Sequence, residues 1–318
     1  MKRLYIAMYH YVRNLRNSRY PGIKGLDYQL FKEQLQFFAT HFHTVTMEDV
    51  IAHYESGKEL PDNALLLTFD DGYIDHYTFV YPMLLQYGMQ GSFFVSAKVF
   101  MEHTLLDVNK IHFILASAPI DELCKDLIEQ LDYYRGQEWN YPSNQELIDQ
   151  YMVADRLDNK ETVFFKQVLQ YVLPEKLRNQ ITSDLFKKVV GVSETVMAHE
   201  LYLNYDQMTL MKEGGMYFGI HGYDHYWMNK LTQAQLQQDI DKALKSLSRL
   251  VDPDKWVINY PCGSYSAEVI DCVRKMGCVM GLTTDVGVVE LEKDDPYKLP
   301  RLDTVDFPPK SENYLYNL

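Results

Sequence analysis

Short apolar runs recur along this chain, and each is followed by polar residues or glycine and then by a helical pattern. The clearest runs lie at residues 65–69, 217–220 and 257–260. Runs of this length are typical of buried strands, and their alternation with helices indicates parallel βα units. The repetition favours a barrel over a chain of unrelated pieces, and in open or closed α/β sheets ligands bind just beyond the carboxyl ends of the strands.

Capping patterns mark where several of the expected helices begin and end. Asp27 can cap one helix, and Thr232 with Gln235 forms a capping box for another. Gly57 and Gly277 each follow a helical stretch and precede another apolar run. Glycine in this place ends a helix. Each of these helices therefore ends before the next predicted strand begins, as repeated βα units require.

Two adjacent carboxylates, Asp70 and Asp71, follow the apolar run Leu65–Phe69 directly. Neighbouring like charges repel, and a folded protein tolerates them best where a cation or a proton neutralises one of them. The pair therefore predicts a metal site at the end of this strand.

Two histidines, His221 and His225, follow a second apolar run. At a spacing of four residues on a helical turn, both imidazoles lie on one face and reach one ion. One carboxylate and two histidines suit a borderline divalent ion such as Zn²⁺, with a position left for water. A His-x-x-x-His pair alone is weak evidence; its place after a strand and the Asp pair give it weight.

A third apolar run ends in the turn Tyr260-Pro261-Cys262-Gly263. One interpretation is a plain connection from strand to helix, in which Ser266 caps the next helix. The other is a loop that offers backbone N–H groups to a developing oxyanion. The residues alone leave both open.

These three segments, in this order, resemble the motifs of the polysaccharide deacetylase family, also called carbohydrate esterase family 4 or the NodB homology domain. The motifs are Thr68-Phe69-Asp70-Asp71-Gly72, His221-x-x-x-His225 and Tyr260-Pro261-Cys262-Gly263. The resemblance covers roughly residues 3–100 and 206–305. It implies a distorted (β/α) barrel of the polysaccharide deacetylase type.

The resemblance also implies roles for the site residues. Asp71, His221 and His225 would bind a divalent metal, most simply Zn²⁺, and Asp70 would be the general base. The turn formed by Tyr260, Pro261, Cys262 and Gly263 would bind substrate, with the backbone N–H of Cys262 stabilising the oxyanion. Such a site removes an N-acetyl group from an amino sugar.

The chain departs from the family pattern at four positions. Gly222 replaces the hydroxyl residue that often follows the first metal histidine, and Cys262 replaces an aromatic residue. Asn259 stands where an arginine usually orients the base. Arg301 is the candidate replacement, although a surface arginine at a strand end is an equal alternative. The leucine-x-histidine motif of the usual general acid is missing, because no histidine follows His225.

His10 is the candidate for the missing general acid, because it follows the predicted strand Leu4–Met8 and should lie at the same end of the barrel. A substrate contact is a second functional interpretation of His10, and a purely structural role in shaping the first loop is the alternative to both. Other histidines, namely His41, His43, His53 and His76, match no motif. We expect these four to be ordinary surface residues.

Residues from about 103 to 205 carry helical signals without intervening strands. Ser143 with Glu146 forms a capping box. Leu147, Ile148 and Met152 continue an apolar helical stripe, and such stripes are more often core or packing surface than a cofactor site. We expect one catalytic domain, 1–318, with a mainly helical insertion beside the catalytic mouth. The insertion would wall off substrate or mediate a homo-oligomer contact.

Charge and composition limit the partners. A formal net charge of −13 disfavours binding to nucleic acid or anionic membranes, because these negatively charged partners attract basic patches. No stretch approaches the roughly 18 to 20 apolar residues of a membrane span, and the first residues predict a strand and not a signal peptide. Four scattered cysteines form no metal-binding or disulfide pattern. We therefore expect a cytoplasmic protein.

The leading hypothesis is a metal-dependent carbohydrate N-deacetylase acting on an amino-sugar-containing polysaccharide or glycoconjugate precursor. A deformylase or an amidohydrolase acting on a non-carbohydrate amide is the alternative enzyme, because related folds reuse such sites. A sugar-binding protein with decayed catalytic machinery is the alternative of another class. Against decay, all three expected metal ligands and the base are present.

Overall fold

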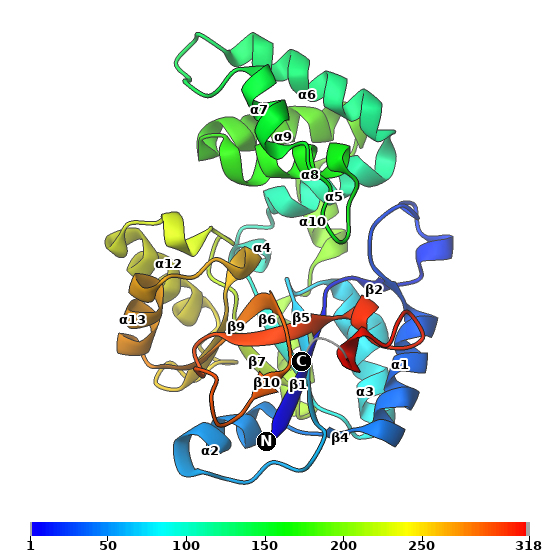
Figure 1. Ribbon diagram of the computed structural model, residues 1–318, viewed down its shortest axis with the longest axis vertical. Helices are drawn as coiled ribbons and strands as arrows, with labels where there is room; N and C mark the ends of the chain where they lie inside the picture. The colour runs from blue at the N-terminus through cyan, green and yellow to red at the C-terminus, as the bar shows by residue number, and fades with distance from the viewer. Residues whose placement is uncertain (1, 316–318) are drawn as a thin grey trace. The chain divides into compact units, whose positions relative to one another are not determined.

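Seven parallel strands close into a barrel in the first of two compact units of the chain (Figure 1). The structure is a computed structural model that describes residues 2–315. The first unit contains the chain up to Asn14, Gly25–Thr104 and the chain from His199 onward, and the second contains Leu15–Lys24 and Leu105–Ala198.

The barrel closes where β1 pairs with β5, in a parallel ladder from Leu4 opposite Ala64 to Tyr9 opposite Phe69. In order around the ring the strands are β1 (Arg3–Tyr9), β11 (Leu299–Asp303), β9 (Cys278–Val286), β8 (Trp256–Asn259), β7 (Tyr217–Ile220), β6 (Gly91–Val95) and β5 (Ala64–Asp70). The short β10 (Val289–Glu290) and β4 (His43–Thr44) add to β1 and β5, and β2 (Val12–Arg13) pairs with β3 (Leu26–Asp27). The predicted (β/α) barrel is confirmed.

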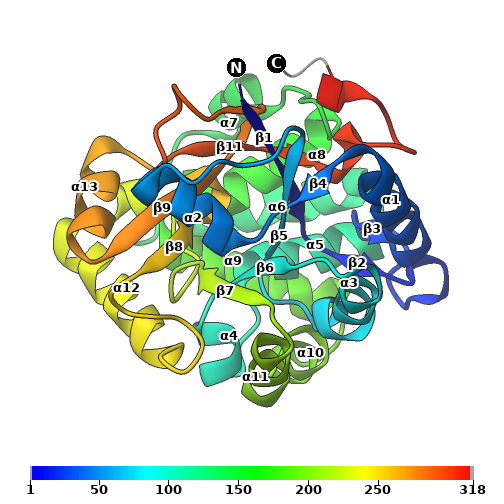
Figure 2. The ribbon, with the colours of Figure 1, turned by 90° about the horizontal axis from the view of Figure 1, so that it is seen from below.

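Helices surround these strands, as Figure 2 shows for α1, α3, α12 and α13. The helices of this unit are α1 (Tyr28–His41), α2 (Met47–Ser56), α3 (Tyr81–Tyr87), α4 (Lys98–Met101), α11 (Tyr205–Glu213), α12 (Gln233–Ser246) and α13 (Ala267–Lys275). A π-helical turn, His76–Val80, precedes α3. The predicted caps are present: the side chains of Asp27 and Thr232 accept backbone N–H groups, and Gly57 ends α2 with a left-handed φ of 72°.

The barrel interior changes from apolar to polar along the strands. Leu4 and Ile6 of β1 and Ala64 and Leu66 of β5 belong to one buried cluster that also includes α2 residues such as Val50. Because side chains alternate between the two faces of a strand, Thr68 and Asp70 lie on the same inward face as Leu66. The same alternation places Arg301 in line with Leu299, and Asn259 in line with Val257. A polar layer therefore lies above the apolar core, at the carboxyl ends of the strands.

The second unit is helical. Its helices are α5 (Asp107–Ser117), α6 (Ile120–Tyr134), α7 (Asn144–Tyr151), α8 (Lys160–Gln167), α9 (Glu175–Val189) and most of α10 (Glu194–Leu201). Helix α5 packs on α9, and α6 packs on α8 around fully buried side chains such as Phe164 and Leu127. The short segment Leu15–Lys24 joins this unit, which the sequence patterns did not indicate.

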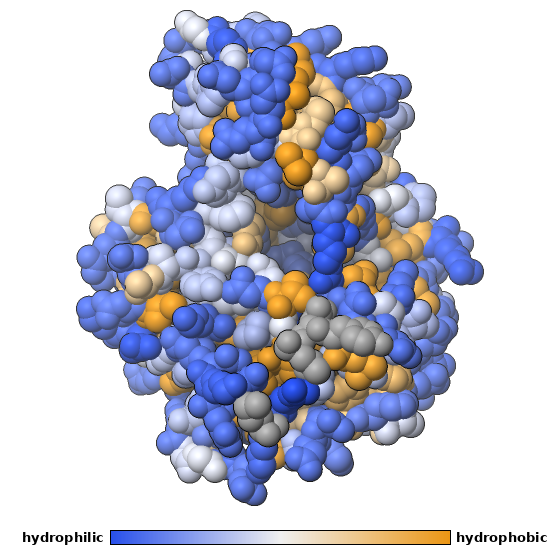
Figure 3. Space-filling view, in the orientation of Figure 1, coloured by the Kyte–Doolittle hydropathy of each residue, from blue (hydrophilic) through white to orange (hydrophobic). Residues whose placement is uncertain are grey.

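Hydrophilic side chains cover most of the visible face of each unit in Figure 3, with small hydrophobic areas between them. This distribution agrees with a charged fraction of 24%. Within residues 2–315, none of the helices has the length and apolar character needed to cross a membrane.

Candidate metal centre and active site

Asp70 and Asp71 are both almost completely buried, at 1% and 3% exposure, although both are carboxylates. Asp70 ends β5 and points inward, whereas Asp71 and Gly72 both have a φ of 70° and turn the chain sharply after the strand. A side chain at Gly72 would place its Cβ 2.6 Å from Val95 Cγ1. Left-handed backbone at a residue such as Asp71 is uncommon and is found at functional sites.

Asp71, His221 and His225 converge on one point. Asp71 Oδ1 lies 3.3 Å from His221 Nε2 and 3.4 Å from His225 Nε2, and the three candidate ligand atoms lie within 4.8 Å of one another. His221 Nδ1 donates to the backbone oxygen of Asn259 at 2.7 Å, because a carbonyl can only accept. In a neutral ring this leaves Nε2 with a lone pair that faces the carboxylate.

Asp71 Oδ1 is buried, and none of the described residues 2–315 donates a hydrogen bond to it. Two acceptor atoms about 3 Å apart repel each other unless a cation lies between them, and a buried charge without a partner is costly. Aspartate and histidine atoms are also the donor types that zinc takes. These residues therefore fit a divalent metal ion.

The histidines lie on a loop, so the predicted helical turn at residues 221–225 is wrong. The backbone there is not helical, and Gly222 and His225 have positive φ values of 70° and 54°. Asp239 of α12 organises this loop, because its two carboxylate oxygens accept the N–H groups of Tyr223 at 2.9 Å and Asp224 at 3.1 Å. The loop thus has an anchor although position 222 lacks a hydroxyl.

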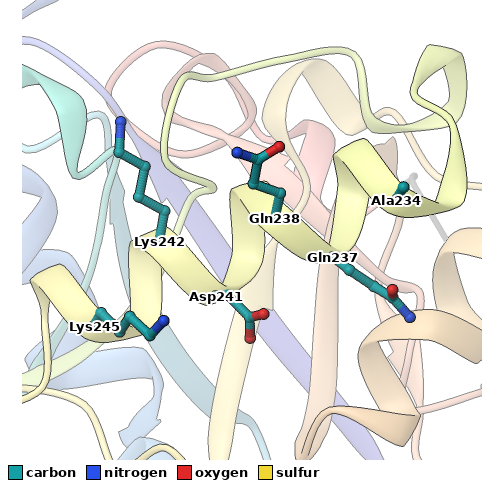
Figure 4. A pocket seen from close by; sticks show the side chains of 6 residues that line it. All are labelled: Ala234, Gln237, Gln238, Asp241, Lys242 and Lys245. Atoms are coloured by element: carbon teal, nitrogen blue, oxygen red, sulfur yellow. The ribbon is translucent and has the colours of Figure 1, made fainter.

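The opposite side of α12 faces solvent. Figure 4 shows a shallow depression there, lined by Ala234, Gln237, Gln238, Asp241, Lys242 and Lys245. All of these side chains are exposed and come from one helix. Asp239 is 6% exposed, whereas Asp241, two residues away on the same helix, is exposed. Asp241 therefore provides a control for substitutions of Asp239.

Replacing Asp239 with alanine should weaken the binding of added Zn²⁺ at the candidate metal centre about 10–100-fold, as loss of partners that orient metal ligands generally does. The reason is that two N–H groups in the histidine loop lose their acceptor. Competition with a chromophoric chelator measures the affinity, and Asp241→Ala is the control. Equal affinities for Asp239→Ala and the wild type would contradict this role.

Arg301 binds Asp70 in a bidentate ion pair deep in the barrel. Its Nη1 lies 3.0 Å from Oδ1 and its Nη2 lies 2.9 Å from Oδ2, and the arginine is 0% exposed. The remaining donors reach the Thr283 backbone oxygen, Thr68 Oγ1 and Asn259 Oδ1. All five N–H groups of the guanidinium are thereby used, and the surface alternative for Arg301 is wrong.

Arg301 orients Asp70, whereas position 259, where the family pattern has an arginine, is an asparagine. Asn259 instead accepts one N–H from the same guanidinium. Burial would raise the pKa of Asp70, but the charges of Arg301 and His10 together hold it below its usual value. Asp70 is therefore a carboxylate throughout the neutral range.

His10 lies at the same end of the barrel, with its Nε2 3.6 Å from Asp70 Oδ2 and its side chain 39% exposed. His76 supports the loop of His10, because its Nε2 donates to the His10 backbone oxygen at 2.9 Å. His76 is 0% exposed, so its prediction as a surface residue is wrong. Burial lowers the pKa of His76 to about 4, which keeps the ring neutral.

The turn after β8 has a strained backbone. Cys262 and Gly263 have φ values of 55° and 65°, and any side chain at Gly263 would overlap Thr284. Tyr260 points its hydroxyl to the Tyr297 backbone oxygen at 2.9 Å, and Pro261 is buried. Ser266 also caps α13, so the structural interpretation of the segment is confirmed. A substrate role for Tyr260, Pro261, Cys262 and Gly263 stays a prediction.

Tyr73 is a site residue that the sequence patterns did not single out. Its hydroxyl donates to Asp71 Oδ2 at 2.5 Å. Burial, and next the charge of Asp71, raise the pKa of Tyr73 well above its usual value. Its place two residues after Asp71 was the only signal in the sequence.

Fold and site together define a (β/α)-barrel protein with a candidate metal centre at the carboxyl ends of its strands. A sequence model of the family described as polysaccharide deacetylase matches residues 57–131 and 179–281, more than half of the chain. The chain belongs to this family. A curated relative, YxkH of Bacillus subtilis (strain 168), is named as a polysaccharide deacetylase and is 20% identical over 292 residues, which are 92% of this chain and 68% of YxkH.

Solved structures show the same fold. The deacetylase PplD of Streptococcus pyogenes, solved in complex with acetate, has a TM-score of 0.59 and 16% identity, with 99% of this chain and 96% of PplD covered. IcaB from Ammonifex degensii has a TM-score of 0.58 and 16% identity, with 99% and 97% covered. A de-N-acetylase from Aggregatibacter actinomycetemcomitans has a TM-score of 0.57 and 15% identity, with 98% and 100% covered.

Proposed function

We propose that this protein is a metal-dependent hydrolase that removes an N-acetyl group from an amino sugar of a polysaccharide or glycoconjugate. The observation that carries the proposal is the buried Asp71 Oδ1 without a donor, which faces two imidazole nitrogens next to a second buried carboxylate. Family membership supports the substrate class, and the solved relatives include proteins named as deacetylases.

Asp71, His221 and His225 would hold the metal, for which the donor set favours Zn²⁺. When bound, the ion polarises the amide carbonyl and lowers the pKa of a coordinated water. Asp70 would accept the proton of the attacking water, and Arg301 fixes the orientation of this carboxylate. The backbone N–H of Cys262 would stabilise the oxyanion, and His10 would protonate the leaving amine.

The test combines metal analysis with an assay of acetate release. Protein purified without chelators should contain close to one zinc ion per chain and release acetate from chitooligosaccharides or UDP-N-acetylhexosamines. Asp71→Ala should lose both the metal and the activity. Metal-free wild-type protein, or an Asp71→Ala variant with unchanged zinc content, would show that the assigned site is wrong. Release of formate from formylated substrates instead would establish a deformylase.

Replacing His10 with alanine should lower kcat for an N-acetyl sugar about 10²-fold, within the range that general acids contribute. The zinc content should not change, because His10 is not among the converging ligands. An aryl acetate provides the control, since its phenolate leaves without protonation and its rate should fall much less. Equal losses on the amide and on the aryl ester would contradict the general-acid role.

A further inference from the structure

The two oxygens of Asp71 have different surroundings. Oδ1 faces the Nε2 atoms of His221 and His225, whereas Oδ2 accepts the Tyr73 hydroxyl at 2.5 Å. The carboxylate is 3% exposed and Tyr73 is 0% exposed. A hydrogen bond from a buried hydroxyl to a carboxylate is among the strong ones, so it fixes the rotation of the Asp71 side chain.

Tyr73 is itself held firmly in place by an aromatic stack. Its ring stacks on Tyr11 with a centroid distance of 4.0 Å and on Tyr202 with a centroid distance of 6.2 Å. The backbone is also tied there, because Leu203 donates its N–H to the Gly72 oxygen at 2.9 Å. The position of the Tyr73 hydroxyl is therefore set by the packing of its ring against these two tyrosines and by this backbone hydrogen bond.

We propose that Tyr73 is a positioning residue that makes Asp71 a one-oxygen ligand of the metal. The proposal rests on the metal site of the proposed function. With Oδ2 held by Tyr73, only Oδ1 is directed toward the two histidine nitrogens. A carboxylate that binds through one oxygen leaves a further coordination position for water and for the substrate carbonyl, which a catalytic site requires. Partners that orient carboxylate ligands in this way typically change metal affinity or activity 10–100-fold.

The test replaces Tyr73 with phenylalanine and uses Co²⁺ as a spectroscopic probe in the full chain. We expect Tyr73→Phe to bind Co²⁺ about 10–100-fold more weakly. Its visible absorption should be weaker, because an additional carboxylate oxygen raises the coordination number. The value of kcat should fall more than KM changes. Tyr202→Phe is the matched control, because it removes a hydroxyl from the same stack but not the one that Asp71 accepts.

Unchanged Co²⁺ affinity and absorption in Tyr73→Phe would overturn the proposal while leaving the metal site intact. Wild-type protein that binds no Co²⁺ would overturn both this proposal and the proposed function. X-ray absorption at the cobalt edge of the wild type tests the same point without a substitution. A short metal to carbon distance, as two-oxygen binding produces, would contradict one-oxygen binding by Asp71.

Discussion

Replacing Asp70 with asparagine should lower kcat for acetate release about 10³–10⁴-fold, the upper part of the range for general acid and base catalysis. Asparagine has nearly the same shape but cannot accept the proton of the attacking water. Asp70 is 1% exposed and lies beside the candidate metal ligands without being one of them. The metal content of the variant should therefore equal that of the wild type.

Metal analysis and initial rates on the same preparations test this prediction. The matched variant is Asp71→Asn, in which the neighbouring carboxylate changes instead. It should lose metal affinity as well as activity, because Asp71 Oδ1 faces both histidine nitrogens. An Asp70→Asn variant that retains its rate to within about tenfold would mean that another group accepts the proton.

The barrel could be predicted from sequence because it depends on repeated local signals. Apolar runs, capping boxes and terminal glycines each reflect interactions over a few residues, and their order along the chain favours one architecture. In β5, side chains alternate between the two faces of the strand, and this alternation places Thr68 and Asp70 on the inward face with Leu66. The candidate ligands could be identified because they follow strands that end at one edge.

The remaining parts of the site depend on contacts between distant segments. Arg301 reaches Asp70 across 231 residues of sequence, and only the position of β11 in the ring brings them together. Asp239 binds the histidine loop from α12, and the sequence of this helix shows only an amphipathic pattern that does not single out Asp239. The helical spacing of His221 and His225 was misleading, because their convergence depends on left-handed backbone. Burial of His76 likewise follows from tertiary packing.

Replacing Arg301 with methionine should have the second largest effect, on stability and on catalysis together. The guanidinium is fully buried and all of its donors are used, so the substitution leaves the Asp70 carboxylate without its cation. Removing one partner of a buried ion pair costs about 3–5 kcal/mol of unfolding free energy. Loss of orientation of the base should also lower kcat at neutral pH about 10²-fold or more.

The pH dependence gives the sharper readout. In the wild type the folded pKa of Asp70 lies below its ordinary value of about 3.9. Its ionisation therefore contributes stability above that value, and this contribution is lost as the pH falls through the folded pKa. Without Arg301, burial dominates and the folded pKa rises above the unfolded one. Ionisation of Asp70 then destabilises the folded state instead of stabilising it. The stability of Arg301→Met relative to the wild type should therefore improve as the pH falls.

Urea unfolding at pH 5 and pH 8, together with the pH profile of kcat, measures these effects. The acidic limb of the profile should move to higher pH in Arg301→Met. Arg301→Lys should lie between the wild type and Arg301→Met, because lysine keeps the charge but cannot form the two parallel hydrogen bonds. Adding Asp70→Asn to Arg301→Met should recover much of the lost stability, since the unpaired charge is then gone. If the double variant is no more stable than Arg301→Met, the cost comes from packing around the guanidinium and not from the ion pair.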